Sequence, residues 1–111
     1  EHDATLLAWA SDNGDPDNFL TPNFSCAAVT GGSNVSRWCR PAFDALLAEA
    51  RQVADTARRD ALYRRAQALY REDAPWVPLV YPTTAIATSR RVTGLAVSPF
   101  GLNNYAKVDL R

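Results

Sequence analysis

Residues 41–75, "PAFDALLAEARQVADTARRDALYRRAQALYREDAP", decide the fold. Apolar residues recur there every three or four positions, which is typical of amphipathic helices. We predict two helices, at about 41–54 and 56–73. Pro41 suits a first helical position, Asp55 can cap the second helix through its side-chain oxygen, and Pro75 ends it.

The apolar residues of both helices predict one core. They are Phe43, Leu46, Leu47, Ala50 and Val53 in the first helix, and Leu62, Ala66 and Leu69 in the second, with Tyr63 and Tyr70 beside them. The arginines of the second helix fall mostly on the opposite face, which predicts a solvated surface: Arg58, Arg59, Arg64, Arg65 and Arg71.

The flanking segments predict strands and a long loop. Residues 4–10 ("ATLLAWA") form a short apolar run and predict a buried strand. Residues 11–40 are rich in Ser, Asn, Asp, Gly and Pro and are expected to be mostly loop. Residues 76–82 and 84–89 predict two more strands, and residues 90–111 a final strand and turn. The predicted fold class is α/β, a mixed α+β arrangement with two helices packed on a small mixed sheet.

Composition and charge narrow the function. The chain has 111 residues, 47% of them hydrophobic, and its 12 basic residues balance 12 acidic ones. No basic excess favours nucleic acid as a partner, and no apolar run is long enough to span a bilayer. The sequence opens without Met and goes directly into the first predicted strand, so we expect a piece of a longer protein whose targeting segment lies elsewhere. The partner of this strand would come either from a part of the longer protein outside this sequence or from a second copy of the chain. The second alternative predicts a homodimer that pairs through an exposed sheet edge.

Two cysteines, Cys26 and Cys39, flank a loop rich in Gly, Ser and Asn. A structural zinc site needs four ligands, and only His2 adds a nitrogen, so no metal site is expected. His2 also makes a poor base for a nucleophilic thiol, because it lies at the end of the chain. A disulfide that stabilises the fold by about 3 kcal/mol is the favoured alternative, and it would indicate an environment outside the reducing cytosol. Two free buried thiols are the other alternative.

The acidic stretch "WASDNGDPDNF" (9–19) is the candidate functional segment. A calcium loop of the EF-hand type that starts at Asp12 would need Asp or Asn at its third position and Glu at its twelfth. Gly14 and Asn23 stand there, so that pattern fails. A carboxylate pair can also catalyse glycoside hydrolysis, but no second catalytic group is recognisable, and no catalytic residues are predicted.

Turn chemistry accounts well for Asp15 and Asp17, because Asp side chains cap nearby amides. Asp12 is different, since it follows Trp9 by three residues at the end of a predicted strand. A cation about 4 Å from a carboxylate gains roughly 4 kcal/mol at an effective dielectric constant of 20, before desolvation is subtracted. Trp9 is suited to stacking on apolar or cationic groups. For Asp12, a turn role and a ligand-binding role both remain open from the residues alone.

Several motifs together resemble a known family. They are "LLAWASDNGDPDNFL", "SRWCRPAFDALLAEA" with the preceding "SC", and "DTARRDALYRRAQALYREDAPWVPLVYP". They resemble the C-terminal part of periplasmic dipeptide- and oligopeptide-binding proteins, the solute receptors of ABC importers. The resemblance implies a two-lobed, non-catalytic receptor without a cofactor. It also implies that Asp12 binds the α-ammonium of the peptide, that Trp9 lines the pocket, and that Cys26 and Cys39 form a disulfide.

The resemblance further implies short peptides and membrane permease subunits as partners, and a periplasmic location. Well under half of a family member is covered, and the arginine that holds the peptide carboxylate in dipeptide receptors lies upstream. Relatives of this type bind nickel chelates, haem, glutathione or oligosaccharides, so these solutes are alternative ligands. A further alternative is a fragment that acts only as a self-associating module.

Overall fold

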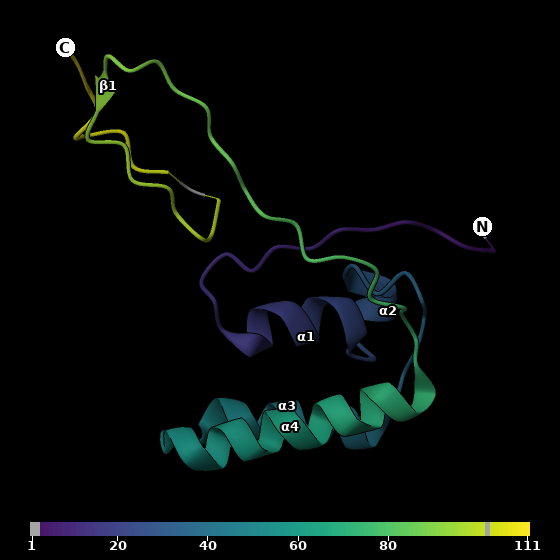
Figure 1. Ribbon diagram of the computed structural model, residues 1–111. Coiled ribbons are helices and arrows are strands. Elements are labelled where there is room, and N and C mark those ends of the chain that lie inside the picture. Colours follow the sequence, from purple (N-terminus) through teal and green to yellow (C-terminus); the bar gives the residue numbers. More distant parts are fainter. Residues whose placement is uncertain (1–2, 102) are drawn as a thin grey trace. The chain divides into compact units, whose positions relative to one another are not determined.

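The computed structural model describes residues 3–101 and 103–111, so His2 lies outside the described residues. Four helices precede two short strands (Figure 1): α1 (Pro16–Phe24), α2 (Ala28–Gly31), α3 (Pro41–Gln52), α4 (Thr56–Asp73), β1 (Val92–Thr93) and β2 (Asp109–Leu110). The chain divides into two compact units. The helical unit is Asp15–Pro78, and the second unit, here called the extended unit, combines Glu1–Gly14 with Leu79–Arg111.

Capping residues and prolines mark the ends of the two long helices. Helix α3 starts at Pro41 and ends at Gln52, slightly before the predicted residue 54. Helix α4 spans the predicted residues, and the Asp55 side chain accepts a hydrogen bond of 2.7 Å from the backbone N–H of Arg58. At its C-terminus Ala74 adopts the left-handed conformation, with a φ of 44°, just before Pro75.

Helices build the core of the helical unit. Figure 1 shows α3 and α4 side by side, and α1 also packs against α3. Phe24 lies at the centre of this core, 1% exposed, with its ring at 4.6 Å from that of Trp76 and at 4.8 Å from that of Tyr70. The predicted core residues of α3 and α4 are buried or pack at its margin: Phe43, Leu46, Leu47, Ala50, Val53, Leu62, Tyr63, Ala66, Leu69 and Tyr70. The helix pattern therefore predicted this core correctly.

Residues 11–40 are not mostly loop, as the sequence suggested, because α1 and α2 lie within them. Helix α1 begins with residues that commonly start helices, but the many Ser, Asn, Asp, Gly and Pro residues of the segment made it look like loop. Asp15 is its N-cap, Pro16 stands at the first helical position, and Asp17 lies in the first turn, where a negative charge favours the helix dipole. Pro22 inside the helix makes the segment look like loop.

A disulfide between Cys26 and Cys39 pins the segment that leads into α3. This finding decides against two free thiols. The buried side-chain amide of Asn34 donates to the carbonyl oxygens of Ser25 and Trp38, at 3.0 and 2.7 Å.

The same segment is tied to the end of α4. The Trp38 indole N–H donates to Asp73 at 2.9 Å, and Arg40 forms ion pairs with Glu72 and Asp73 at 3.0 and 3.2 Å. Covalent and polar contacts thus fix residues 34–40 against the helices.

In the extended unit, β1 and β2 form a two-stranded antiparallel sheet with Val92 opposite Leu110 and Thr93 opposite Asp109. A further bridge joins Ala96 and Asn104. Gly94, with a φ of +75°, makes the close approach possible, because a Cβ atom there would collide with the carbonyl oxygen of Lys107. The predicted mixture of helices and strands is present, with the sheet antiparallel in the described residues.

The strands expected at 4–10, 76–82 and 84–89 are absent from the described part of the chain. A strand requires a hydrogen-bonded neighbour, and the strand pairs and bridge of the described residues include none of these segments. Their large apolar side chains are consequently exposed, with Leu6 at 83%, Val80 at 79% and Tyr81 at 91%. Apolar pattern alone predicted an extended backbone but could not supply the pairing partner.

Candidate functional site

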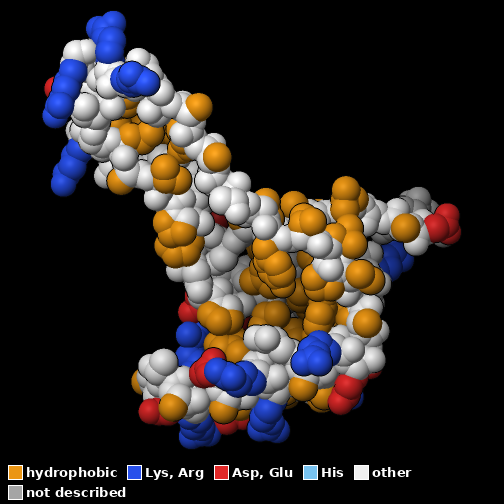
Figure 2. All heavy atoms as spheres, viewed as in Figure 1, with side chains coloured by type: hydrophobic (Ala, Val, Ile, Leu, Met, Phe, Trp, Pro, Cys, Tyr) orange, Lys and Arg blue, Asp and Glu red, His pale blue; other side chains and the backbone are white. Residues whose placement is uncertain are grey.

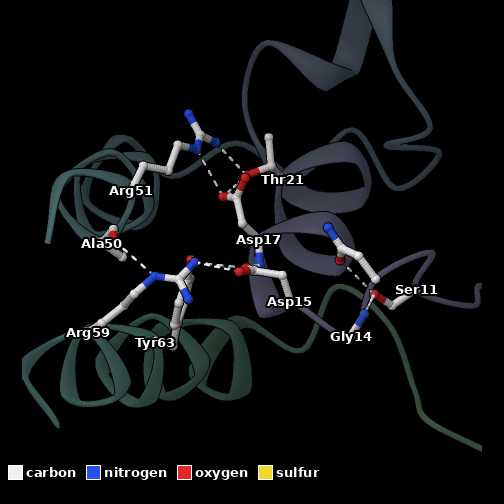
Figure 3. A network of polar contacts seen from close by, with 10 residues as sticks. Ser11, Gly14, Asp15, Asp17, Thr21, Ala50, Arg51, Arg59 and Tyr63 are labelled. Atoms are coloured by element: carbon white, nitrogen blue, oxygen red, sulfur yellow. Dashed lines mark hydrogen bonds and ion pairs between the residues drawn. The ribbon is translucent and has the colours of Figure 1, made fainter. Parts of the chain in front are cut away.

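Trp9 and Asp12 both lie in the extended unit, where Trp9 is half-buried and Asp12 is exposed. Asp12 begins a bend that ends at Gly14. The Ser11 hydroxyl closes this bend by accepting a hydrogen bond of 2.9 Å from the Gly14 N–H (Figure 3). The same hydroxyl donates to the Asn13 side chain at 3.4 Å. The bend therefore presents the Asp12 carboxylate on a segment with its own internal hydrogen bonds.

Asp15, three positions further on, has a structural role. One carboxylate oxygen accepts a hydrogen bond of 2.8 Å from the Asp17 N–H and so caps α1. Both oxygens also accept from Nη2 of Arg59 on α4, at 2.9 and 2.8 Å (Figure 3). Arg59 is held in turn by the Ala50 carbonyl and the Tyr63 hydroxyl. Asp15 thus joins the start of α1 to α4.

This environment changes the acidity of Asp15. Burial by itself would raise the pKa of the carboxyl group, but the hydrogen bond from Asp17 N–H and the Arg59 guanidinium outweigh it. The net result is a pKa below the ordinary value of 3.8. Burial raises the pKa of the Tyr63 hydroxyl, against the lowering effect of Arg59. The pair therefore holds Asp15 in its charged form.

Asp17 is also held within the helical unit. Its carboxylate pairs with Nε of Arg51 at 2.9 Å and accepts a hydrogen bond of 2.7 Å from the Thr21 hydroxyl. Figure 3 shows Arg51 and Arg59 reaching α1 from α3 and α4. The sequence prediction that Asp15 and Asp17 serve local structure is confirmed, and the two arginines extend that role to packing between helices.

Arg59 departs from the predicted solvated face of α4. Figure 2 shows several arginine side chains on the outside of the helical unit, but the Arg59 side chain is only 30% exposed. One sequence signal was available, since Arg59 precedes the core residue Tyr63 by four positions and so shares its face of the helix. Its guanidinium carbon lies 5.0 Å from the centre of the Tyr63 ring. Charge counting alone gave no reason to separate Arg59 from its neighbours.

No group of three or more His, Cys, Asp or Glu side chains within residues 3–101 and 103–111 is arranged to hold a metal ion. Two of the three carboxylates in the acidic stretch have arginine partners instead. The third carboxylate, Asp12, is exposed on its bend.

No protein-family model matches the chain. Solved structures do match it. The dipeptide binding protein from Pseudoalteromonas sp. SM9913, in complex with Met-Leu, gives a TM-score of 0.83 at 37% identity over 93% of this chain and 20% of that one. The ABC transporter-associated periplasmic binding protein DppA from Helicobacter pylori, in complex with peptide STSA, gives 0.84 at 38% identity over 92% and 20%. The fold is that of a segment of a two-lobed periplasmic binding protein.

A relative with a similar sequence is a binding protein for short peptides. Di/tripeptide-binding protein 4 of Pseudomonas aeruginosa (strain UCBPP-PA14) is 49% identical over all 111 residues. The chain spans about one fifth of that relative, 21% of its length. The resemblance to peptide-binding proteins of ABC importers, which the sequence motifs indicate, is confirmed.

Proposed function

We propose that this chain is part of a receptor that binds dipeptides or other short peptides in the periplasm and delivers them to an ABC importer. The receptor binds its ligand and performs no chemistry on it. Two matched structures, with 37% and 38% identity to this chain, are described as complexes with peptides, which favours peptides over metal chelates, haem, glutathione or oligosaccharides.

Within this receptor, Asp12 binds the α-ammonium group of the peptide. The observation that carries this proposal is the exposure of Asp12 on its bend, in a chain that matches two peptide complexes at 37% and 38% identity. Asp15 and Asp17 form ion pairs with arginines of α4 and α3, which gives these two carboxylates structural roles. A charge-assisted hydrogen bond from an ammonium group to a carboxylate is about twice as strong as a neutral one.

Trp9 forms a wall of the same site. Its indole is half-buried, which holds the ring in place and leaves part of its surface for a ligand. An aromatic face attracts both apolar groups and cations. Asp12 therefore supplies recognition of charge and Trp9 supplies shape, and the residues that complete the site belong to parts of the receptor outside this chain.

Calorimetry on the full-length receptor tests the role of Asp12. We expect N-acetylation of a dipeptide, or the substitution Asp12→Asn, to weaken binding by at least about tenfold, or 1.4 kcal/mol. Acetylation should then have little further effect on the Asp12→Asn receptor. Asp60→Asn, at an exposed ion pair on α4, is a matched control that should bind normally. Unchanged affinity for the acetylated dipeptide would show that the assignment of Asp12 is wrong.

The proposed partners are the permease subunits of the importer, and the proposed location is the periplasm. Among residues 3–101 and 103–111, no helix has both the length and the apolar character needed to cross a membrane. Fractionation of cells that express the full-length protein tests the location, and a cytosolic distribution would contradict it.

Self-association is a second candidate activity for the chain by itself. Leu6, Val80 and Tyr81 lie on extended backbone and expose most of their apolar surface, and unpaired extended segments can pair with another chain. A homodimer of the chain would cover them. Sedimentation of the 111-residue chain decides this point, because a strict monomer at high concentration would contradict the homodimer.

A further inference from the structure

An aromatic ring supports the bend that carries Asp12. Gly14, the last residue of the bend, has a φ of +75° and faces Phe100. A Cβ atom at Gly14 would lie 3.0 Å from Cζ of the Phe100 ring and 2.8 Å from Cε1, and the second distance is shorter than real Cβ contacts. The absence of a side chain at Gly14 therefore lets the backbone of the bend rest directly on the ring. Both residues belong to the extended unit.

The ring of Phe100 is itself held by a turn. The Ser98 hydroxyl accepts a hydrogen bond of 3.1 Å from the Phe100 N–H, and the Ser98 N–H donates to the Asn103 side chain at 2.8 Å. The bridge between Ala96 and Asn104 closes the hairpin below this turn. The support for the bend is thus anchored on both sides of Phe100.

We propose that Phe100 is a positioning residue for Asp12, an inference that rests on the proposed function. It sets the direction of the carboxylate through the contact between its ring and Gly14, without touching the ligand's ammonium group. Removing the ring takes away this packing support for the bend at Gly14, while the hydrogen bonds of Ser11 remain. The carboxylate then samples more directions, and binding an ammonium group costs more conformational entropy.

A double-mutant cycle on the full-length receptor tests this coupling. The variants are Phe100→Ala, Asp12→Asn and the combination, each titrated with a dipeptide and its N-acetylated form. We expect Phe100→Ala to weaken binding of the free dipeptide about tenfold in the wild-type background and less than twofold in the Asp12→Asn background. Binding of the acetylated dipeptide should change less than twofold.

Matched variants separate positioning from general loss of structure. Phe100→Leu keeps an apolar group against Gly14 and should restore most of the affinity. Tyr81→Ala removes an aromatic ring that is 91% exposed in the same unit and should have no effect. Thermal unfolding followed by circular dichroism confirms that each variant is folded.

The outcomes distinguish the two proposals. A tenfold loss from Phe100→Ala that persists unchanged in the Asp12→Asn background would overturn the positioning role and leave Asp12 intact. The positioning role would also be overturned if the Phe100→Ala receptor bound the free dipeptide normally while the Asp12→Asn receptor bound it weakly. If Asp12→Asn itself has no effect, the proposed function fails, and the positioning role fails with it.

Discussion

The helical unit and the extended unit treat their apolar side chains in opposite ways. Phe24, Phe43 and Leu47 of the helical unit are at most 1% exposed, whereas Leu6, Val80 and Tyr81 of the extended unit are between 79% and 91% exposed. The helical unit covers its hydrophobic surface with its own helices, a disulfide and ion pairs. The difference teaches that the helical unit supplies the cover for its own apolar residues, whereas the extended unit does not supply it for Leu6, Val80 and Tyr81.

The largest effect on stability is expected from a substitution in the core of the helical unit. Phe24→Ala should lower the free energy of unfolding by about 3–5 kcal/mol, because it removes a ring that Trp38, Phe43, Tyr70 and Trp76 surround. Urea unfolding of the 111-residue chain, followed by circular dichroism, measures this. Tyr105→Ala, at a side chain 62% exposed in the extended unit, should change it by less than about 0.5 kcal/mol. Equal losses from the two variants would remove the contrast between the units.

The disulfide offers the next test. The Cys26→Ser/Cys39→Ser variant should lose about 3 kcal/mol of stability, since the unfolded chain is no longer constrained. The measurement is urea unfolding of this variant beside the oxidised chain. Wild-type chain treated with a reductant should match the variant. An unchanged urea midpoint in both the variant and the reduced chain would contradict this expectation. It would mean that the contacts of Asn34, Trp38 and Arg40 hold the segment without the disulfide.

A smaller effect should follow acidification. The pKa of Asp15 is lowered in the folded protein, so its charged form adds stability that is present above pH 3.8 and is lost as pH falls through the folded pKa. Asp15→Asn keeps a capping side chain but loses the charge facing Arg59. As the pH falls through 3.8 and below, the urea midpoint of the wild type should fall more steeply than that of Asp15→Asn. Parallel profiles would show that titration of Asp15 contributes no stability to the fold.

The smallest effect on stability is expected from a substitution at Asp12, the residue proposed to bind the ligand. Asp12→Asn should change the free energy of unfolding by less than about 0.5 kcal/mol, because its side chain is exposed on a bend outside the helical core. Urea unfolding of the chain measures this alongside the binding experiments on the full receptor. A loss of 2 kcal/mol or more would mean that Asp12 mainly serves the fold.

Sequence reasoning succeeded where an element contains its own signals. Pro41, Asp55 and Pro75 mark the ends of the two long helices, and the spacing of Phe43, Leu47 and Ala50 marks the buried face. Helix α1 was missed because Pro22 and the surrounding polar residues conceal a start signal at Asp15 and Pro16.

Other features depend on groups far apart in the sequence. The ion pair of Asp15 with Arg59 joins two helices, and the support of Gly14 by Phe100 joins two distant turns. No local pattern contains these contacts, because they form only when the chain is folded. For the same reason an apolar run such as 4–10 predicts extended backbone without showing what it pairs with.

The buried amide of Asn34 has a consequence for producing this protein. Residues 34–36, Asn-Val-Ser, match the acceptor sequence for N-linked glycosylation in eukaryotic secretory pathways. The nitrogen that would carry the sugar is the atom that donates to the carbonyls of Ser25 and Trp38, at a residue only 3% exposed. A glycan attached there during secretion from yeast or mammalian cells would prevent residues 34–40 from docking, so a bacterial host is the suitable source of the folded protein.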